Sequence, residues 1–227
     1  MGKLRKKKMR NAKKIVFLCK RTIIMTNKAK PFIKWVGGKT QLIETIENSL
    51  PKDFGNQSDL TYIEPFVGGG AVLFWILQKY PNIKKAVIND INPDLTTVYK
   101  TIKTNPKELI MELRSIADEY LPLSEEKRKE YYLAKRDRFN TKSLEPVENS
   151  ALFIYLNRTC FNGLYRVNSK GLFNVPFGKY ANPKICDEQT ILADSELLQK
   201  VEILTGDFEA TVKLVGEKSF FYFDPPY

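Results

Sequence analysis

Short apolar runs separated by glycine-rich turns occur near both ends of the chain and predict buried strands. Positions 61–64, 85–89 and 201–204 are runs of this kind, and the apolar stretch 71–79 has the length of a short helix. Runs of about four to eight apolar residues between turn signals are typical of strands in a parallel sheet. The order strand, loop, helix, strand predicts an α/β fold.

Between positions 93 and 156 the apolar residues recur at helical spacing. The segment 151–156 (ALFIYL) predicts a buried helix, and 159–180 is rich in asparagine and glycine, which favours a hairpin or a long loop. The residues that share one predicted helical face are Ile110, Leu113, Ala117 and Tyr120. We therefore expect an α/β domain, formed by residues 25–92 and 187–227, that is interrupted at 93–186 by a helical insert carrying a hairpin.

The tetrapeptide Asp224-Pro225-Pro226-Tyr227 follows the apolar run 219–223 (SFFYF), which predicts another buried strand. A carboxylate, two prolines and an aromatic ring at the end of a strand suit the binding of a planar exocyclic amine. Asp224 can accept one N–H and the Pro225 carbonyl a second, while the Tyr227 ring can stack on a base. The prolines restrict the backbone and so hold these acceptors in place.

Composition excludes several classes of protein. The chain contains no histidine and three cysteines without metal spacing, Cys19, Cys160 and Cys186, which excludes Ser-His-Asp triads and histidine-ligated metals. We expect no metal cofactor. No apolar run approaches the ~20 residues of a membrane span, and 15–19 is shorter than the ~7–15 residues of a signal-peptide core. We therefore predict a cytoplasmic protein that does not enter the membrane.

The net charge of +11 is concentrated in one segment. Residues 1–24 hold ten lysines and arginines and no acidic residue, so the rest of the chain is nearly neutral. The segment can be interpreted as a phosphate-binding tail, or as a disordered basic extension before the true start at Met25. We favour the disordered extension, so the global charge says little about nucleic-acid binding.

A second basic segment lies inside the insert. Between Asn149 and Cys186 there is no acidic residue, and lysines and arginines are interleaved with aromatic residues and asparagines. Such a mixture supplies phosphate contacts, hydrogen bonds to base edges and stacking surfaces. On composition alone, a solvated loop explains the segment equally well.

Two glycine-rich segments are candidate ligand loops. In 34–40 (KWVGGKT), a phosphate-binding loop would need glycine at position 33, which is Ile33, so a nucleotide-hydrolase interpretation is weak. The run 68–70 lacks the third glycine of the dinucleotide fingerprint, because position 73 is Leu73. It suits a smaller adenosyl ligand or is simply a tight turn. Asp90 lies about 20 residues further on, which is the spacing of a ribose-binding acid.

The motifs KWVGGK, EPFVGGGA, NDIN, GDF and DPPY, in this order, resemble the Dam family of DNA adenine N6-methyltransferases. The segments 162–169 (NGLYRVNS) and 173–178 (FNVPFG) resemble the DNA-contacting hairpin of the family's GATC-specific members in restriction–modification systems. The resemblance covers 31–227 essentially without gaps. It implies a Rossmann-like methyltransferase sheet with an inserted DNA-recognition domain at 93–186.

The resemblance implies S-adenosylmethionine as the cofactor. Positions that match cofactor-contacting residues of the family are Trp35, Lys39, Glu64, Pro65, Phe66, Gly68, Gly70, Asp90, Asp207, Phe208 and Asp224. Among them, Asp90 matches the acid that holds the ribose hydroxyls, and Asp207 with Phe208 matches the pair near the cofactor's adenine. The catalytic positions are Asp224, Pro225, Pro226 and Tyr227.

The resemblance also implies double-stranded DNA as the partner. Positions expected to contact DNA are Phe161, Asn162, Leu164, Arg166, Asn168, Pro176 and Lys179. Arg166 matches the arginine that contacts the first guanine of GATC. Phe161 and Asn162 match the pair inserted where the adenine leaves the stack, and Phe161 replaces the tyrosine of the best-known members, which preserves stacking but not a hydroxyl contact.

The expected reaction is methyl transfer to N6 of a flipped adenine, with neither a metal nor a covalent enzyme intermediate. Cytosine N4 offers the same chemistry, and only the resemblance favours adenine. The hairpin disfavours an RNA or protein-glutamine substrate. We expect a monomer, with a cognate restriction endonuclease as its functional partner.

The resemblance also predicts further strands after DPPY, because the family continues beyond this point. We therefore expect the 227-residue chain to be a C-terminally truncated fragment, incomplete on that side of its sheet, with low stability and little activity. The alternative to a methyltransferase is then an inactive remnant that binds cofactor or DNA.

Overall fold

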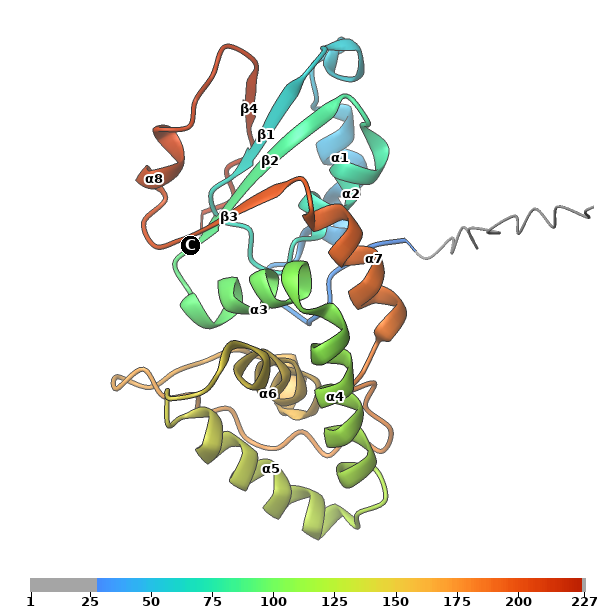
Figure 1. Ribbon diagram of the computed structural model, residues 1–227, viewed down its shortest axis with the longest axis vertical. Helices are drawn as coiled ribbons and strands as arrows, with labels where there is room; N and C mark the ends of the chain where they lie inside the picture. The colour runs from blue at the N-terminus through green and yellow to red at the C-terminus, as the bar shows by residue number, and fades with distance from the viewer. Residues whose placement is uncertain (1–27, 226–227) are drawn as a thin grey trace, which may run out of the picture.

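A four-stranded, all-parallel sheet forms one end of the molecule in the computed structural model, which describes residues 28–225 (Figure 1). In spatial order the strands are β3 (Val201–Thr205), β2 (Ile83–Asp90), β1 (Leu60–Glu64) and β4 (Ser219–Phe221). The strands predicted at 61–64, 85–89 and 201–204 are confirmed. The predicted extension 1–24 and two of the predicted catalytic residues, Pro226 and Tyr227, lie outside the described residues.

The two central strands, β1 and β2, form the most buried part of the sheet. Tyr62 and Ile63 of β1 and Ala86, Val87 and Ile88 of β2 are almost completely buried. Continuous apolar runs of this kind are what a parallel sheet between two helical layers requires. Since all four strands are parallel, their carboxyl ends lie at one edge of the sheet, and the candidate site is built at this edge.

The prediction of a buried strand over 219–223 was wrong in two respects. Strand β4 ends at Phe221, and its three residues are only half-buried. The physical reason is its position at the edge of the sheet, where it pairs only with β1. Beyond the strand, the side chain of Phe223 is 52% exposed.

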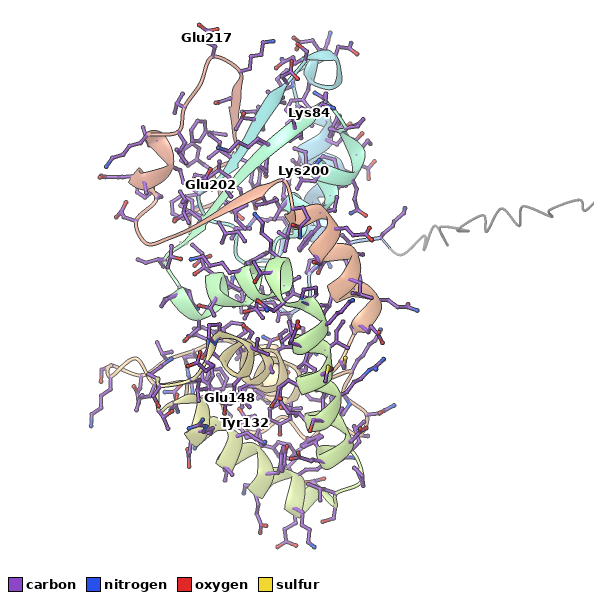
Figure 2. The ribbon with its side chains drawn as sticks, in the orientation of Figure 1. Lys84, Tyr132, Glu148, Lys200, Glu202 and Glu217 are labelled. Atoms are coloured by element: carbon purple, nitrogen blue, oxygen red, sulfur yellow. The ribbon has the colours of Figure 1, made fainter. Side chains whose placement is uncertain are left out.

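The helices surround the sheet and continue into a separate helical part of the molecule. They are α1 (Ile43–Asn48), α2 (Ala71–Lys79), α3 (Pro93–Thr104), α4 (Pro106–Tyr120), α5 (Glu125–Phe139), α6 (Pro146–Thr159), α7 (Glu188–Leu198) and α8 (Glu209–Val212). Short 3₁₀ turns occur at Lys39–Leu42, Phe54–Asn56 and Phe161–Gly163. Helices α4, α5 and α6 form the helical part (Figure 1). Figure 2 shows Tyr132 and Glu148 in this part, away from Lys84, Lys200 and Glu202 around the sheet.

Helix α3 connects the two parts because it packs against β3 and α7 on one side and α6 on the other (Figure 1). Its start is fixed locally: the side chain of Asn92 accepts hydrogen bonds from the backbone of Asp94 and Leu95, and Pro93 occupies the first turn. Helix α6 is buried on nearly all sides, in contact with α3, α4 and α5. No helix within residues 28–225 is both long and apolar enough to cross a lipid bilayer.

Candidate functional site

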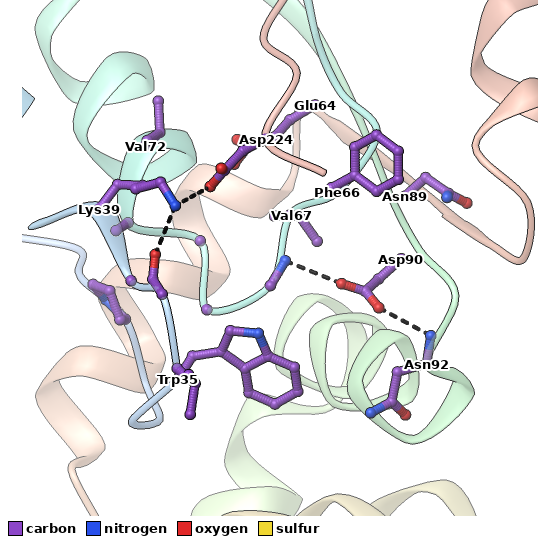
Figure 3. A pocket seen from close by; sticks show the side chains of 18 of the residues that line it. Trp35, Lys39, Glu64, Phe66, Val67, Val72, Asn89, Asp90, Asn92 and Asp224 are labelled. Carbon is purple, nitrogen blue, oxygen red and sulfur yellow. Dashed lines mark hydrogen bonds and ion pairs between the residues drawn. The ribbon is translucent and has the colours of Figure 1, made fainter. Parts of the chain in front are cut away.

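The carboxyl ends of the strands surround a pocket with a volume of ≈ 980 Å³ (Figure 3). Its walls come from segments far apart in the sequence, namely 31–40, the loop 64–72 after β1, 89–92 at the end of β2, 206–208 after β3, and 224–225 after β4. Pockets of about 300–1,000 Å³ are usual for cofactors and other small ligands. The edge where parallel strands end is also where open α/β sheets bind ligands.

The glycine loop, residues 65–70, forms the floor of this pocket. Gly68 and Gly70 have φ values of +50° and +76°, which side chains of L-residues rarely adopt. Space also excludes a side chain, because a Cβ atom on Gly70 would lie 2.4 Å from the hydroxyl of Tyr99. That hydroxyl donates to the carbonyl of Gly68 at 2.9 Å. Glycine is therefore needed here for both conformation and close packing.

Asp90 lies at the tip of β2, where backbone groups orient its carboxylate (Figure 3). Its oxygens accept hydrogen bonds from the backbone N–H of Gly68 at 3.1 Å and of Asn92 at 2.9 Å. Burial raises the pKa of Asp90, and the backbone N–H donors oppose this shift. A carboxylate fixed in this way on the wall of a pocket suits the hydroxyl groups of a ribose.

Asn89, next to Asp90, ties together the loops that follow β1 and β3. Its side-chain amide donates to the carbonyl of Pro65 at 3.2 Å and to that of Gly206 at 3.0 Å. The residue is 1% exposed and lines the pocket. Its Oδ1 atom is buried and has no hydrogen-bond partner among the described residues. The Asn89 side chain therefore serves the site through its N–H groups, which join the two loops.

Asp224 enters the pocket from the end of β4, where it forms an ion pair with Lys39 (Figure 3). The Lys39 Nζ atom lies 2.7 Å from Asp224 Oδ2 and donates to the carbonyl of Gly37 at 3.0 Å. The neighbouring Glu64 is 3% exposed and accepts a 2.8 Å hydrogen bond from the Tyr62 hydroxyl. Burial raises the pKa of Glu64 to about 8 and nearby Asp224 adds to this, against the hydrogen bond from Tyr62. The pocket wall thus places Asp224, in its ion pair with Lys39, beside the buried Glu64, whose pKa is raised.

Trp35 forms the wall of the pocket that faces the helical part. A Cβ atom on Gly68 would lie 2.8 Å from its indole nitrogen, so the ring packs directly on the glycine loop. Away from this loop, the indole ring stacks with Tyr165 at 5.7 Å and with Phe153 at 6.4 Å between centroids. Trp35 therefore contacts the pocket and the helical part at the same time.

The recognition loop, residues 159–180, leaves the end of α6 and folds back as an irregular hairpin. Two isolated antiparallel bridges, Cys160 with Phe177 and Val167 with Phe173, hold its arms together. Side chains from the helical part replace the missing ladder, because Asn140 accepts from the backbone N–H of Phe173 at 2.8 Å and donates to its carbonyl at 3.0 Å. The predicted hairpin is therefore confirmed, although no regular strand forms within this loop.

Arg166 projects from this loop and is held by Asn174 on the opposite arm. Arg166 Nε donates to the side-chain oxygen of Asn174 at 2.8 Å, and its Nη2 atom donates to the backbone carbonyl of the same residue at 3.2 Å. A guanidinium carries five N–H donors. These two bonds occupy the side of the guanidinium that carries Nε and leave the outer edge, with Nη1, directed away from Asn174.

The remaining predicted DNA-contacting residues divide by exposure. Phe161 is 51% exposed, and Asn162, Asn168 and Pro176 are also exposed. Asn168 caps the turn of the hairpin by accepting from the backbone of Lys170 and Leu172. Leu164 is half-buried against the core. Lys179 lies 2.7 Å from Glu125 in a surface ion pair that is exposed to solvent and salt.

Comparisons with known proteins agree with this geometry. Residues 35–227 match the model of the family described as D12 class N6 adenine-specific DNA methyltransferase. The type II methyltransferase M.MjaIII of Methanocaldococcus jannaschii is 56% identical over 200 residues, which cover 87% of this chain and 69% of that protein.

The chain belongs to the D12 class of N6 adenine-specific DNA methyltransferases.

Two further relatives of this family are the type II methyltransferase M1.LlaDCHI of Lactococcus lactis subsp. cremoris and a DNA adenine methylase of Haemophilus influenzae. They are 43% and 38% identical to this chain, over 87% and 88% of its length. The chain covers 66% and 64% of these two proteins, so it spans about two thirds of the curated relatives that it matches. The membership in the Dam family expected from the ordered motifs is confirmed.

Within this family framework, the structure brings the predicted cofactor residues together. The residues of that set that line the pocket are Trp35, Lys39, Glu64, Phe66, Gly68, Gly70, Asp90, Asp207, Phe208 and Asp224, and the carbonyl of Pro65 is held by Asn89. Among residues 28–225, no three acidic or cysteine side chains are grouped so that they could hold a metal ion. The predicted DNA-contacting residues lie apart from this set, on the recognition loop.

Sequence reasoning did not identify Asn89, Tyr99, Asn140 or Tyr165 as parts of the site. Each acts through a contact that spans 22 residues or more of chain or through a ring stack, as in the bond between Tyr99 and Gly68, 31 positions apart. Asn89 lies within the NDIN motif and could have been noted there, because a polar residue inside a buried strand needs hydrogen-bond partners. Tyr165 lies within the segment 162–169 that resembles the DNA-contacting hairpin, but its contact with Trp35 has no local signal. Tyr99 and Asn140 carry no local signal.

Proposed function

We propose that this chain transfers a methyl group from S-adenosylmethionine to N6 of adenine in duplex DNA, at the sequence GATC. The observation that carries the proposal is the position of Asp224, which points into the pocket from the end of β4 while Asp90 lies at the end of β2. One pocket thus offers an acceptor for ribose hydroxyls and a separate carboxylate for an exocyclic amine.

The pocket residues fit an adenosyl ligand with a charged tail. Asp90 would hold the ribose hydroxyls, and the glycine loop allows close approach because Gly68 and Gly70 have no side chains. Phe208 is 39% exposed and lies 5.4 Å from Phe66 between ring centroids, which offers an aromatic surface to the adenine ring. When bound, S-adenosylmethionine supplies an activated methyl group on a positively charged sulfur.

The residues after β4 act on the amine that receives the methyl group. The lone pair of adenine N6 is delocalised into the ring, which makes it a poor nucleophile. Asp224 and the carbonyl of Pro225 would accept its two N–H groups, favour a pyramidal nitrogen and offset the positive charge that develops during attack. A base within a duplex cannot reach this pocket, so the adenine must leave the stack, at a cost of a few kcal/mol.

The recognition loop supports the choice of GATC. Its outer surface carries Arg166, whose guanidinium edge is directed away from Asn174, and the exposed ring of Phe161. An arginine that contacts guanine O6 and N7 through two N–H groups is the commonest specific contact to that base. Arg166 would contact the first guanine, and Phe161 with Asn162 would occupy the gap left by the flipped adenine.

The test is methylation of a short duplex that contains one GATC site, with S-adenosylmethionine as donor. We expect N6-methyladenine, formed at the low rate expected for this chain, in the hydrolysed duplex, detected by mass spectrometry, and no N4-methylcytosine. Duplexes altered at each position of the site in turn define the specificity. Methylation of all duplexes at one rate contradicts the GATC assignment. Cofactor or DNA binding without any methyl transfer supports a binding remnant instead.

A further inference from the structure

Three nearly parallel aromatic rings connect the pocket to the recognition loop. The ring of Tyr165 lies 5.7 Å from that of Trp35 and 5.2 Å from that of Phe153, with interplanar angles of 26° and 29°. Trp35 is part of the pocket wall, whereas Tyr165 belongs to the recognition loop. Stacked rings of this kind stabilise one another beyond the effect of the area that they bury.

The hydroxyl of Tyr165 makes a second connection to the same edge of the sheet. It donates to Asp94 Oδ2 at 3.1 Å, and the same oxygen pairs with Lys142 at 2.7 Å. Asp94 lies in the first turn of α3, two residues after Asn92, whose backbone N–H orients Asp90. Burial, and secondarily the nearby Asp94, raise the pKa of Tyr165, so the hydroxyl remains a donor at neutral pH.

Tyr165 directly precedes Arg166 in the chain, so the contacts that hold its ring also restrain the backbone next to the guanidinium. The other anchor of Arg166, Asn174, lies one residue from Phe173, whose ring is 5.7 Å from that of Tyr165. A displaced Tyr165 therefore disturbs both arms that hold Arg166.

We propose that Tyr165 is a positioning residue that couples the cofactor pocket to Arg166, so that cofactor and target DNA increase each other's affinity. This inference rests on the proposed function. The physical reason is that the stack of Trp35, Tyr165 and Phe153 must be ordered for both ligands. The first ligand that orders it reduces the conformational entropy that the second has to remove. Linkage requires the effect to be reciprocal.

The coupling can be measured on the full chain with S-adenosylhomocysteine, the product form of the cofactor, which allows no turnover. The affinity for a GATC duplex is measured with and without this ligand, and the affinity for the ligand with and without the duplex. We expect about fivefold tightening in both directions, at the lower end of usual coupling free energies. Tyr165→Leu, which removes the stack, should abolish the coupling, and Tyr165→Phe should retain most of it.

A matched control is Tyr131→Leu. Tyr131 is also half-buried in an aromatic cluster, with Tyr120 and Tyr155 at 6.0 Å and 5.9 Å, but this cluster lies in the helical part away from the pocket. We expect its coupling to equal that of the wild type. Equal loss of coupling in both leucine variants would indicate general loosening and would overturn the inference.

A measurement on the wild type keeps the inference testable if Tyr165→Leu does not fold. Hydrogen exchange of the backbone N–H groups of Asn168 and Asn174, which bond across the recognition loop, should slow when S-adenosylhomocysteine binds. Unchanged exchange, or an intact coupling in Tyr165→Leu, overturns the inference and leaves the proposed function untouched. A wild-type protein that binds no DNA contradicts the proposed function itself.

Discussion

Two loops in this molecule face the proposed ligands, and they are held in place differently. The glycine loop follows β1 directly, and the backbone N–H of Val67 donates to the carbonyl of Asn89 in the adjacent β2 at 3.0 Å. The recognition loop has two isolated bridges and a few backbone hydrogen bonds between its arms, but no regular strand pairing. Side chains of the helical part also hold its backbone, such as Asn140 and the hydroxyl of Tyr132, which donates to the carbonyl of Val175 at 2.8 Å.

Both loops nevertheless depend on side-chain amides that bond two backbone groups. Asn89 joins the carbonyls of Pro65 and Gly206, whereas Asn140 bonds both the N–H and the carbonyl of Phe173, as a neighbouring strand would. The difference lies in the origin of the amide. In the pocket the amide comes from the sheet, so the geometry of the proposed reaction site depends on the strands. In the recognition loop it comes from the helices, so specificity can change while the sheet stays the same.

The largest expected effect separates chemistry from binding. Asp224→Asn should lower the single-turnover rate of methyl transfer about 10²–10³-fold, because a preorganised group that offsets developing charge is lost. DNA binding through the recognition loop should be unchanged. The control is Asp137→Asn, because Asp137 is a highly exposed residue of α5 (74% exposed side chain). A fall in DNA affinity as large as the fall in rate would contradict the separation.

A paired experiment tests the comparison of the two loops directly. Asn89→Ala leaves the carbonyls of Pro65 and Gly206 without their donor, and each unpaired buried group costs about 1–3 kcal/mol. We expect cofactor affinity to fall about tenfold or more, as measured by calorimetry. Asn140→Ala should lower the affinity for DNA and reduce the preference for GATC over other sequences, while cofactor affinity stays within about twofold. If both variants lower the affinity for cofactor and for DNA equally, the two loops are not held independently.

A smaller effect concerns the first base of the site. Arg166→Ala should cost about 1–3 kcal/mol of discrimination against duplexes altered at the first guanine. Asn174→Ala should cost part of the same amount, because it frees the Nε side of the guanidinium, and the double variant should be no worse than Arg166→Ala. Lys170→Ala, an exposed cation of the same loop, is the control. An unchanged preference in Arg166→Ala would refute its role.

The smallest expected effect depends on pH. Asp194 of α7 is 0% exposed and accepts from the backbone N–H of Lys30 at 3.0 Å, just before the segment that enters the pocket. Burial raises its pKa from 3.8 to about 8, and the hydrogen bond from Lys30 opposes this shift. The folded state therefore binds this proton more tightly than the unfolded state, so the free energy of unfolding decreases as pH rises between these values.

In Asp194→Asn the side chain no longer binds or releases this proton, but its oxygen can still accept the hydrogen bond from the backbone N–H of Lys30. We expect the thermal midpoint of the wild type to fall relative to that of the variant between about pH 4 and pH 8. A difference of about 1 kcal/mol corresponds to about 2–4 °C for a chain of this size. Glu64, with a pKa also near 8, contributes equally to both proteins. Parallel pH profiles would contradict the assignment.

Much of the sheet and pocket could be predicted from the sequence because strands, turns and tips have local signatures. The strand ends at Glu64 and Asp90, the glycine loop, and helix α2 from Ala71 to Lys79 all agree with the structure. Burial of β4 was mispredicted because an apolar run does not reveal whether its strand lies in the centre or at the edge of a sheet. The role of Trp35 in joining two parts was not predictable, since its partners lie far along the chain.

The position of Trp35 also means that intrinsic tryptophan fluorescence can report ligand binding. The chain has two tryptophans, and the second, Trp75 of α2, packs edge-on against Tyr80 at 5.9 Å. Trp35 touches the pocket with its indole nitrogen and the recognition loop with its ring face. In Trp75→Phe, all tryptophan emission would come from this junction. The emission wavelength and intensity of Trp35 would then report the binding of either ligand in real time, without an attached dye.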